Sequence, residues 1–383
     1  LTQQVSLLWP LVMDLMNTED RLRFSFGKTP EALRDLLSSM RAPLDPVWQC
    51  LDKLNDLVQK SLDPKEEGLL NRDIAENWQA PVGMMLARAE QMSEALSWLA
   101  TEEKEGELPV ARWLTRTPYG EDWDIILSAS PISVADQLRQ NLWNRCYGAV
   151  VTSATLTALN SFNSLRWESG LPQWATYERV ASPFNYQENG ELQVVQLGSD
   201  PKSDQFGDDV HDWLDKEVDL KGATLVLFSS RVQLEAARER FLKPWKEELL
   251  CQNFLPKAEI IRRHKERIDQ KKGSVIFGLA SFAEGIDLPG SYVTHVVIVK
   301  IPFAVPDDPI QAAISEWMES SGRNPFMELT LPAASIRLIQ ACGRLIRQES
   351  DTGRVSILDK RLISSRYGNL LLDALPPFRR VAG

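Results

Sequence analysis

The chain has 383 residues, of which 43% are hydrophobic and 25% are charged, as in a globular protein with two or three domains. Its 43 basic and 53 acidic residues give a net charge of −10, which excludes a protein coated in positive charge but leaves room for a local basic groove. No apolar run reaches the length of a membrane span, so we expect no membrane segment.

Residues 1–100 predict a helical module. Apolar residues recur there at spacings of three and four, which is typical of amphipathic helices. Thr29 and Pro30 form a helix-start signal. We expect the tryptophans of this region to anchor the core of a helical bundle. The expected helices are 5–16, 30–40, 47–62 and 77–99, and the tryptophans are Trp9, Trp48, Trp78 and Trp98.

The next fifty residues change character. An acidic run at 102–107 predicts a solvated loop. Two extended segments then flank a turn signal at Pro118 to Gly120, which indicates a hairpin. The expected elements are strands at 110–115 and 123–128, a capped helix at 133–143 and a strand at 148–152.

The remainder alternates between strands and helices, with the change of pattern near residue 145. Such alternation predicts an α/β fold with a parallel sheet covered by helices on both faces. The expected strands are 192–197, 224–229, 274–277, 293–299 and 354–358. The expected helices are 205–218, 231–242, 258–271, 309–320 and 333–347.

The four cysteines lie roughly a hundred residues apart, and the three histidines are equally scattered. No pair has the spacing of metal ligands, so we expect reduced thiols, no metal site and a cytoplasmic protein. The chain begins at Leu1 without a methionine or a signal-peptide layout, so we expect it to be a fragment of a longer protein.

The stretch from Gln340 to Arg347 carries the strongest chemical signal. Arg344 and Arg347 are three apart on one face of an expected helix, and Gln340 and Gly343 lie beside them. A guanidinium always carries its charge and offers a planar fork of donors to phosphate oxygens. The pattern suits an arginine finger, which stabilises charge on a phosphoryl group in transfer. An ordinary amphipathic helix with two exposed arginines is the alternative.

Four other stretches end strands or begin helices in the α/β part, and each alone has a structural explanation. The helix start after residue 230 could hold a phosphate at its N-terminus. The stretches are Val150-Val151-Thr152-Ser153-Ala154-Thr155-Leu156, Ser182-Pro183-Phe184-Asn185, Leu225-Val226-Leu227-Phe228-Ser229-Ser230-Arg231 and Ser281-Phe282-Ala283-Glu284-Gly285-Ile286-Asp287-Leu288-Pro289-Gly290.

Together with 340–347, and in this order, these stretches resemble motifs III to VI of superfamily 2 helicases, in particular the XPD/DinG branch. The likeness rests on T-S-A-T-L, F-A-E-G-I-D-L-P-G and Q-A-C-G-R-L-I-R, within a similarity from about 114 to 377. It implies a RecA-like motor domain preceded by a mostly helical arch domain. The implied domains are the arch at 1–128, the last part of the first motor domain at 129–180 and the second motor domain at 181–383.

The resemblance also implies roles for individual residues. Arg347 is similar to the family's arginine finger and Arg344 to a second phosphate contact, with Gln340 coupling them to motif III. The implied nucleotide-cleft residues are Glu284, Gly285, Asp287 and Gly343. Ser153 and Thr155 would couple the nucleotide state to DNA binding. The implied DNA contacts are Ser229, Ser230, Arg231 and Arg323.

A basic stretch at 262–267, followed by Lys271 and Lys272, is the densest in the chain. Its Arg263 is a further candidate for DNA binding. A solvated helix face is the alternative explanation, and the sequence leaves both open.

Two parts of an ATP-hydrolysing motor are absent from these 383 residues. A P-loop needs G-x-x-x-x-G-K-[ST], but Gly27-Lys28-Thr29 has Leu22 where the first glycine belongs, and no D-E-x-H occurs. The resemblance places both motifs, and the cysteines of a 4Fe-4S cluster, upstream of Leu1. We therefore expect ATP and Mg²⁺ to act in the full-length protein, and the fragment alone to be inactive and without a cluster.

The resemblance implies a 5′ to 3′ DNA helicase that acts on single-stranded or forked DNA, in repair and at stalled replication. The chain is similar to a bacterial paralogue of DinG that is associated with the chi subunit of the DNA polymerase III clamp loader. We expect the C-terminal tail to be exposed, with Phe378, Arg379 and Arg380 as candidate partner contacts. The alternative is a non-catalytic scaffold that tethers such a partner. A nuclease would need acidic metal ligands, for which the sequence shows no cluster.

Overall fold

The structure is a computed structural model that describes residues 2–65, 68–102, 107–120, 122–279, 282, 284–304 and 307–382. Residues 103–106 of the acidic run and the motif residues Ser281 and Ala283 lie outside the described residues. The chain forms two compact units. The first comprises Leu1–Val134 and Val305–Pro325, and the second comprises Ala135–Ala304 and Phe326–Gly383.

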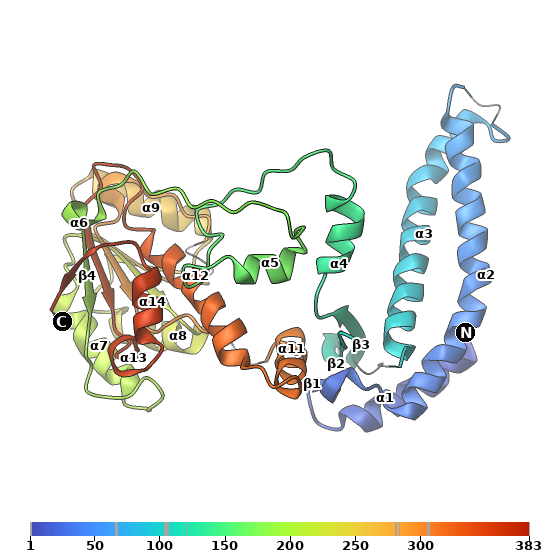
Figure 1. The fold of residues 1–383 in the computed structure, drawn as a ribbon, viewed down its shortest axis with the longest axis horizontal. Helices are drawn as coiled ribbons and strands as arrows, with labels where there is room; N and C mark the ends of the chain where they lie inside the picture. The colour runs from blue at the N-terminus through green and yellow to red at the C-terminus, as the bar shows by residue number, and fades with distance from the viewer. Residues whose placement is uncertain are drawn as a thin grey trace. The chain divides into compact units, whose positions relative to one another are not determined.

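Three helices build most of the first unit: α1 (Thr2–Met16), α2 (Glu31–Leu62) and α3 (Arg72–Ala100). Figure 1 shows α2 and α3 as a long antiparallel hairpin. The prediction of two helices at 30–40 and 47–62 is wrong, because α2 continues through Pro43 and Pro46. Proline removes one backbone hydrogen bond, but buried residues on either side of the prolines, Met40 before them and Val58 after them, hold the helix against its neighbours.

A small antiparallel sheet packs beside these helices. Its strands, in the order β1-β2-β3, are β1 (Arg21–Arg23), β2 (Val110–Tyr119) and β3 (Asp122–Pro131), and a 3₁₀ turn, η1 (Ser25–Gly27), follows β1. The β2–β3 pairing confirms the predicted hairpin. Arg112 on β2 is fully buried, and its guanidinium donates to the carbonyls of Gly27, Trp98 and Thr101.

Helix α11 (Pro309–Ser320) has the predicted bounds, which its capping explains. The Asp308 side chain accepts from Gln311 N at 2.8 Å, and Pro309 fills the first helical position. Its Glu316 pairs with Arg23 at 2.6 Å and accepts from Phe26 N at 2.6 Å. The segment 305–325 therefore belongs to the first compact unit, although the sequence analysis assigned it to the second motor domain.

The tryptophans of the first unit are less buried than expected. Helix α3 packs on α2 through Ala75, Val82, Ala89 and Leu96, which recur every seven residues. Trp78 lies outside this row and is 51% exposed, and Trp9 on α1 is 45% exposed. Trp48 and Trp98 are half-buried. The prediction of core anchors is wrong for Trp9 and Trp78.

The second unit is organised by a seven-stranded parallel sheet in the order β10-β4-β9-β8-β5-β7-β6. This confirms the predicted α/β fold with a parallel sheet. The two edge strands, β6 and β10, were not predicted. The strands are β4 (Gly190–Val194), β5 (Ala223–Phe228), β6 (Leu249–Cys251), β7 (Ser274–Leu279), β8 (His295–Ile298), β9 (Gly353–Ile357) and β10 (Arg379–Val381).

Helices cover both faces of this sheet (Figure 1). On β5, Val226 and Phe228 pack into the cluster that includes α7 and α8, while Leu225 and Leu227 pack into the cluster that includes α9 and α12. The helices are α7 (Phe206–Glu217), α8 (Arg231–Phe241), α9 (Lys257–Asp269), α12 (Leu331–Cys342), α13 (Arg361–Ser364) and α14 (Gly368–Ala374), with short turns at η3 (Gly290–Tyr292) and η4 (Phe326–Thr330). This burial of both faces explains the apolar runs of the strands.

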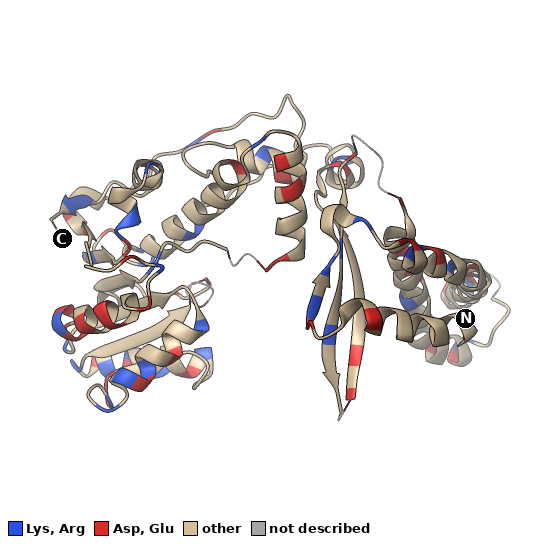
Figure 2. Ribbon diagram, turned by 90° about the horizontal axis from the view of Figure 1, so that it is seen from below, with Lys and Arg blue, Asp and Glu red and all other residues tan. Residues whose placement is uncertain are grey.

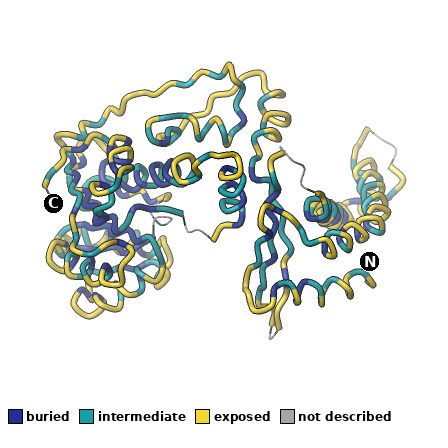
Figure 3. The backbone as a smooth tube through the Cα atoms, turned by 60° about the horizontal axis from the view of Figure 1, so that its bottom comes forward, coloured by how far each residue is buried: buried dark blue, intermediate teal, exposed yellow. Residues whose placement is uncertain are grey.

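The segment before the sheet holds only short helices: α4 (Ala135–Leu138), η2 (Arg139–Trp143), α5 (Asn163–Ser169) and α6 (Tyr186–Asn189). The predicted strand at 148–152 is wrong. Val150 is 93% exposed and Val151 45% exposed, and the tube in Figure 3 is exposed along this stretch. A strand needs a hydrogen-bonded neighbour, and no strand in the described part of the chain pairs with 148–152.

The C-terminal tail is part of the fold. Phe378 is only 5% exposed, and its ring lies 5.1 Å from that of Tyr186. A Cβ on Gly190 would come within 2.4 Å of the Phe378 ring, so only glycine fits there. Because β10 pairs with β4, the prediction of an exposed tail is wrong, and Phe378 does not offer an accessible aromatic side chain to a partner.

Candidate nucleotide and nucleic-acid site

The two arginines of the 340–347 stretch do not lie on a helix. Helix α12 ends at Cys342, where Gly343 N donates to Ile339 O at 2.8 Å, and Arg344 and Arg347 follow in turns. The prediction of a helix to residue 347 is therefore wrong. The guanidiniums nevertheless converge. Arg344 Nη1 donates to Ile286 O at 2.8 Å, and Arg347 Nη2 donates to the same oxygen at 3.0 Å.

This pair keeps donors for a further acceptor. Each guanidinium has five N–H groups, and Arg344 Nε is buried without a hydrogen-bond partner among the described residues. A buried, unpaired cationic donor is costly unless an acceptor reaches it. The neighbouring Leu345 and Ile346 are 1% and 2% exposed, so the core holds the backbone between the arginines. The site therefore fits an anion such as a phosphate.

The oxygen that the arginines share belongs to the turn 284–290. Ile286 and Leu288 are buried and anchor this turn, while Glu284 and Asp287 point outward as exposed residues. Gly285 has a φ of 71°, in the left-handed region that favours glycine. Lys257, at the start of α9, donates from Nζ to Glu284 O at 2.6 Å. Sequence reasoning missed Lys257, because a lysine at a helix start is no signal by itself.

Asp351 connects the turn 284–290 to the arginine segment. It is only 2% exposed, and its Oδ1 accepts from Gly290 N at 2.9 Å. Its Oδ2 accepts from Arg347 N at 2.8 Å and from Gln348 N at 2.9 Å. The sequence analysis missed this residue too, since an aspartate before Thr352-Gly353 reads as an ordinary turn.

Gln340 and motif III meet in the structure. Gln340 Nε2 donates to Thr155 Oγ1 at 3.3 Å, and Ser153 Oγ accepts from Thr155 N at 3.3 Å. Gln340 and Thr155 lie 185 positions apart in the chain. The contact is the one that a coupling between the arginine segment and motif III would use.

Three candidate DNA contacts lie at the carboxyl end of β5. Ser230 caps α8 by accepting from Gln233 N at 3.3 Å, and Ser229 Oγ donates to Gln233 Oε1 at 2.9 Å. Arg231 is exposed. Strand β5 pairs with β7, whose carboxyl end leads into the turn 284–290, so these residues and that turn leave adjacent strands. The capping roles show that the two serines also have a local structural function.

Two arginines of the basic stretch pair with carboxylates of their own helix, α9. Arg263 Nε donates to Glu259 at 2.5 Å, and Arg262 pairs with Glu259 and Glu266. The hydrogen bonds from the two arginines lower the pKa of Glu259 to about 2. Figure 2 shows both signs of charge interleaved on helices of this unit. This pattern favours the solvated helix face over a dense phosphate-binding patch.

The remaining candidates have partners of their own. Arg323 belongs to the first unit and stacks over Trp317, 5.5 Å from the ring centre. Arg379 pairs with Glu191 at 2.6 Å, and Arg380 lies 3.5 Å from Asp373. Both are about 60% exposed at the side chain.

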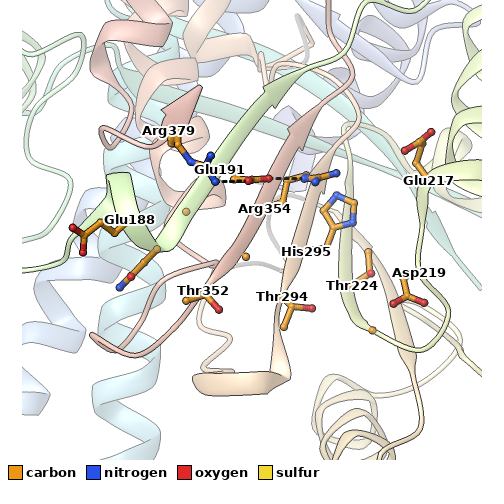
Figure 4. Close-up of a pocket in the computed structure, with 14 residues that line it drawn as sticks. Glu188, Glu191, Glu217, Asp219, Thr224, Thr294, His295, Thr352, Arg354 and Arg379 are labelled. Carbon is orange, nitrogen blue, oxygen red and sulfur yellow. Dashed lines mark hydrogen bonds and ion pairs between the residues drawn. The ribbon is translucent and has the colours of Figure 1, made fainter. Parts of the chain in front are cut away.

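A cavity of about 430 Å³ opens at the amino ends of β4, β5, β8 and β9 (Figure 4). Glu191 lies between Arg354 and Arg379 in it, and His295 Nε2 lies 2.9 Å from Ser356 Oγ. No residue predicted to bind nucleotide or DNA lines this cavity. Ligands of open α/β sheets bind at the carboxyl ends of the strands, so this cavity is not the candidate site.

The described residues contain no group of three or more His, Cys, Asp or Glu side chains arranged to hold a metal ion. Over the same ranges, no helix combines the length and apolarity that crossing a bilayer requires. Burial raises the pKa of the Cys251 and Cys342 thiols to about 12, so neither forms a thiolate near neutral pH. The Gly27–Thr29 segment is structural: Gly27 O accepts from Arg112, and Thr29 Oγ1 donates to Leu99 O.

Comparison with known proteins finds similarity to helicases. The helicase C-terminal domain family matches residues 216–378. The chain is 38% identical over 364 residues to the ATP-dependent DNA helicase DinG of Photobacterium profundum. The chain is therefore similar to DinG helicases along nearly all of its own length. It is also 36% identical to the ATP-dependent DNA helicase DinG of Escherichia coli.

The matched region is about half of these relatives' length. The alignment covers 94% of this chain but 52% of the Photobacterium DinG helicase, and 93% against 50% for the Escherichia coli one. The chain thus spans about half the length of the DinG helicases that it matches.

Solved XPD structures share the fold of this chain. An XPD helicase has a TM-score of 0.52 at 16% identity, covering 97% of this chain and 67% of that one. The Xpd4 protein of S. tokodaii has a TM-score of 0.54 at 14% identity, with coverages of 99% and 66%.

Proposed function

We propose that this chain is the C-terminal part of an ATP-dependent DNA helicase and supplies arginines to its ATP site. The observation that carries the proposal is the convergence of Arg344 and Arg347 on Ile286 O, which leaves the buried Arg344 Nε without a partner in the described structure. Phosphoryl transfer needs positioned countercharge more than covalent chemistry. Two fixed guanidiniums beside a glycine turn provide such countercharge.

In this proposal Arg347 is the arginine finger and Arg344 contacts a second phosphate oxygen. The exposed Glu284 and Asp287, with Gly285 and Gly343, line the nucleotide cleft. Bound ATP with Mg²⁺ would supply the phosphoryl group, and the residues that cradle its phosphates and hold the metal would come from outside this chain, since the 383 residues contain neither a P-loop nor D-E-x-H. A 4Fe-4S cluster would likewise belong to that other part.

The DNA substrate and the domain assignment are also proposals. Ser229, Ser230 and Arg231 would contact the backbone of single-stranded or forked DNA, and the Gln340–Thr155 contact would relay the nucleotide state through Ser153. Arg263 and Arg323 are weaker candidates, because each already has a partner within its own unit. The first unit would act as the arch, and the whole would move 5′ to 3′ in the bacterial cytoplasm during repair and at stalled replication.

The decisive experiment compares DNA-stimulated ATP hydrolysis of the full-length protein with that of its Arg347→Ala variant. We expect the kcat to fall roughly a thousandfold, with nucleotide binding retained, because a missing finger removes stabilisation of the transition state. Arg354→Ala is the matched control, since Arg354 is a half-exposed arginine of the same unit that pairs with Glu191. A kcat within threefold of wild type for Arg347→Ala would reject the finger.

A scaffold that tethers the chi subunit of the polymerase III clamp loader is the competing proposal, and the tail bears on it. Of the three candidate contacts there, Arg379 and Arg380 are exposed and Phe378 is buried. Deleting the tail would remove strand β10, so the sharper test is binding of chi to the Arg379→Glu/Arg380→Glu double variant. Unchanged affinity would exclude a tail contact.

A further inference from the structure

We propose that Asp351 is a positioning residue that fixes the place of the arginine finger, Arg347. This inference rests on the proposed function, and it concerns a residue outside the motif 340–347. Asp351 lies four residues beyond Arg347, in the turn that leads to β9. Its carboxylate is the only described side chain that accepts hydrogen bonds from the backbone of both Arg347 and Gly290.

The need for such a residue follows from the end of α12. The helix stops at Cys342, so helical hydrogen bonds do not fix the backbone at Arg347. In the described structure the backbone N–H groups of Arg347 and Gln348 both donate to Asp351 Oδ2. A buried carboxylate that accepts from several N–H groups forms strong, charge-assisted bonds. Asp351 therefore fixes the backbone at Arg347, where no helical hydrogen bond does so.

The same carboxylate also fixes the acceptor of the finger. Asp351 Oδ1 accepts from Gly290 N at 2.9 Å, and Gly290 lies four residues after Ile286 on the anchored turn. The oxygen of Ile286 holds Arg347 Nη2 at 3.0 Å. One side chain thus positions the backbone that carries the guanidinium and the turn that receives it. A small shift of Asp351 would move both ends of this contact.

An amide cannot replace this carboxylate. Asparagine keeps one acceptor oxygen and presents an NH₂ group on the other side, where the backbone also offers N–H donors. At least one buried N–H group then loses its acceptor. We expect the Arg347 segment to separate from the turn 284–290 in Asp351→Asn, while the remainder of the sheet unit stays folded.

The test uses the full-length protein and four variants: Asp351→Asn, Arg347→Ala, their double variant and Asp359→Asn. Asp359 is the matched control, because it is another fully buried carboxylate of the same unit that accepts from two backbone N–H groups, those of Ile301 and Arg361. Urea unfolding of each variant measures its loss of stability. Steady-state kinetics with single-stranded DNA measure kcat and KM for ATP.

We expect Asp351→Asn to lower kcat roughly 10- to 100-fold with little change in KM, since misplacement of a catalytic group has effects of this size. Asp359→Asn should lose comparable stability but less than about threefold in kcat. In the double variant, Asp351→Asn should add nothing to the loss caused by Arg347→Ala. If the asparagine variant is insoluble, Asp351→Glu serves in its place with the same coupling expected.

Equal kcat values for Asp351→Asn and Asp359→Asn would overturn the proposal, as would losses that add in the double variant. Failure of the proposed function looks different. In that case Arg347→Ala itself would keep its kcat, whatever Asp351→Asn does.

Discussion

Two arginines share one backbone oxygen in the candidate site. A carbonyl oxygen has two lone pairs, so Ile286 O accepts from Arg344 and Arg347 without forcing either bond to weaken. Each contact uses one of five donors, which leaves the outer edge of each guanidinium for a ligand. The shared oxygen therefore orients the two guanidiniums and uses only one N–H donor of each.

His295 makes the stability of the second unit depend on pH. Burial, with the nearby Arg354, lowers the pKa of His295 from 6.5 to about 4. The unfolded chain takes up a proton near pH 6.5 and the folded one only near pH 4, so stability is complete above pH 6.5 and falls between these values. The difference corresponds to about 3 kcal/mol. Urea unfolding at pH 7.5, 6, 5 and 4 measures this change in the free energy of unfolding.

His295→Gln should flatten this pH dependence. Some dependence should remain, because burial also lowers the pKa of His264, whose Nε2 donates to Tyr292 O. A variant with the same slope as wild type would contradict the assignment to His295.

At the scale of secondary-structure elements, tertiary contacts determine which unit a helix belongs to and which of its faces are buried. Asp308 and Pro309 define the start of helix α11. Its Glu316 contacts Arg23 and Phe26 N, which places the helix in the first unit. Helix α3 buries Ala75, Val82, Ala89 and Leu96, while its apolar residues Ile74, Trp78 and Met85 stay exposed. Local capping thus explains where α11 begins, while packing explains which faces of the helices are covered.

The end of α3 depends on one buried guanidinium. Arg112 donates to Trp98 O and Thr101 O at this helix end and to Gly27 O. Arg112→Met would leave these carbonyls without that donor, at about 1–3 kcal/mol for each buried group. We expect a loss of about 3 kcal/mol or more for the first unit, seen as faster amide exchange in α3 and β2.

The matched control is Arg88→Met, because Arg88 is an exposed arginine on the same helix. It should change exchange rates little, and the second unit should be unaffected in both variants. Equal protection in Arg112→Met and Arg88→Met would contradict a stabilising role of the buried guanidinium.

At the scale of the whole molecule, the chain passes between its two units three times, after residues 134, 304 and 325. The unit with the parallel sheet contains the arginine pair, the motif III contact and the strand-end serines. In the proposed function this unit would provide countercharge, and the P-loop and D-E-x-H motifs that would cradle ATP and hold its metal do not occur in the 383 residues.

We therefore predict that this chain alone shows no DNA-stimulated ATP turnover. Phosphate cradling and metal binding need the P-loop and D-E-x-H motifs that its sequence lacks. The measurement is ATP hydrolysis with and without single-stranded DNA, with the full-length protein as the positive control. Appreciable turnover by the isolated chain would contradict the prediction.

The sequence by itself was sufficient for the parallel sheet, the hairpin at 110–131 and the likeness to DinG helicases. Each depends on local patterns, such as apolar runs in buried strands, turn residues and short motifs. It also identified Arg344, Arg347 and Gln340 as a group, because they lie within eight residues.

Only the tertiary structure decided how that group is held. Asp351 reaches Gly290 across 61 positions and Gln340 reaches Thr155 across 185, and no local pattern encodes such contacts. The same reason explains the failed predictions at 148–152 and at Phe378. An apolar stretch becomes a strand only beside a hydrogen-bonded neighbour, and a terminal aromatic is buried only where a surface such as that over Gly190 receives it.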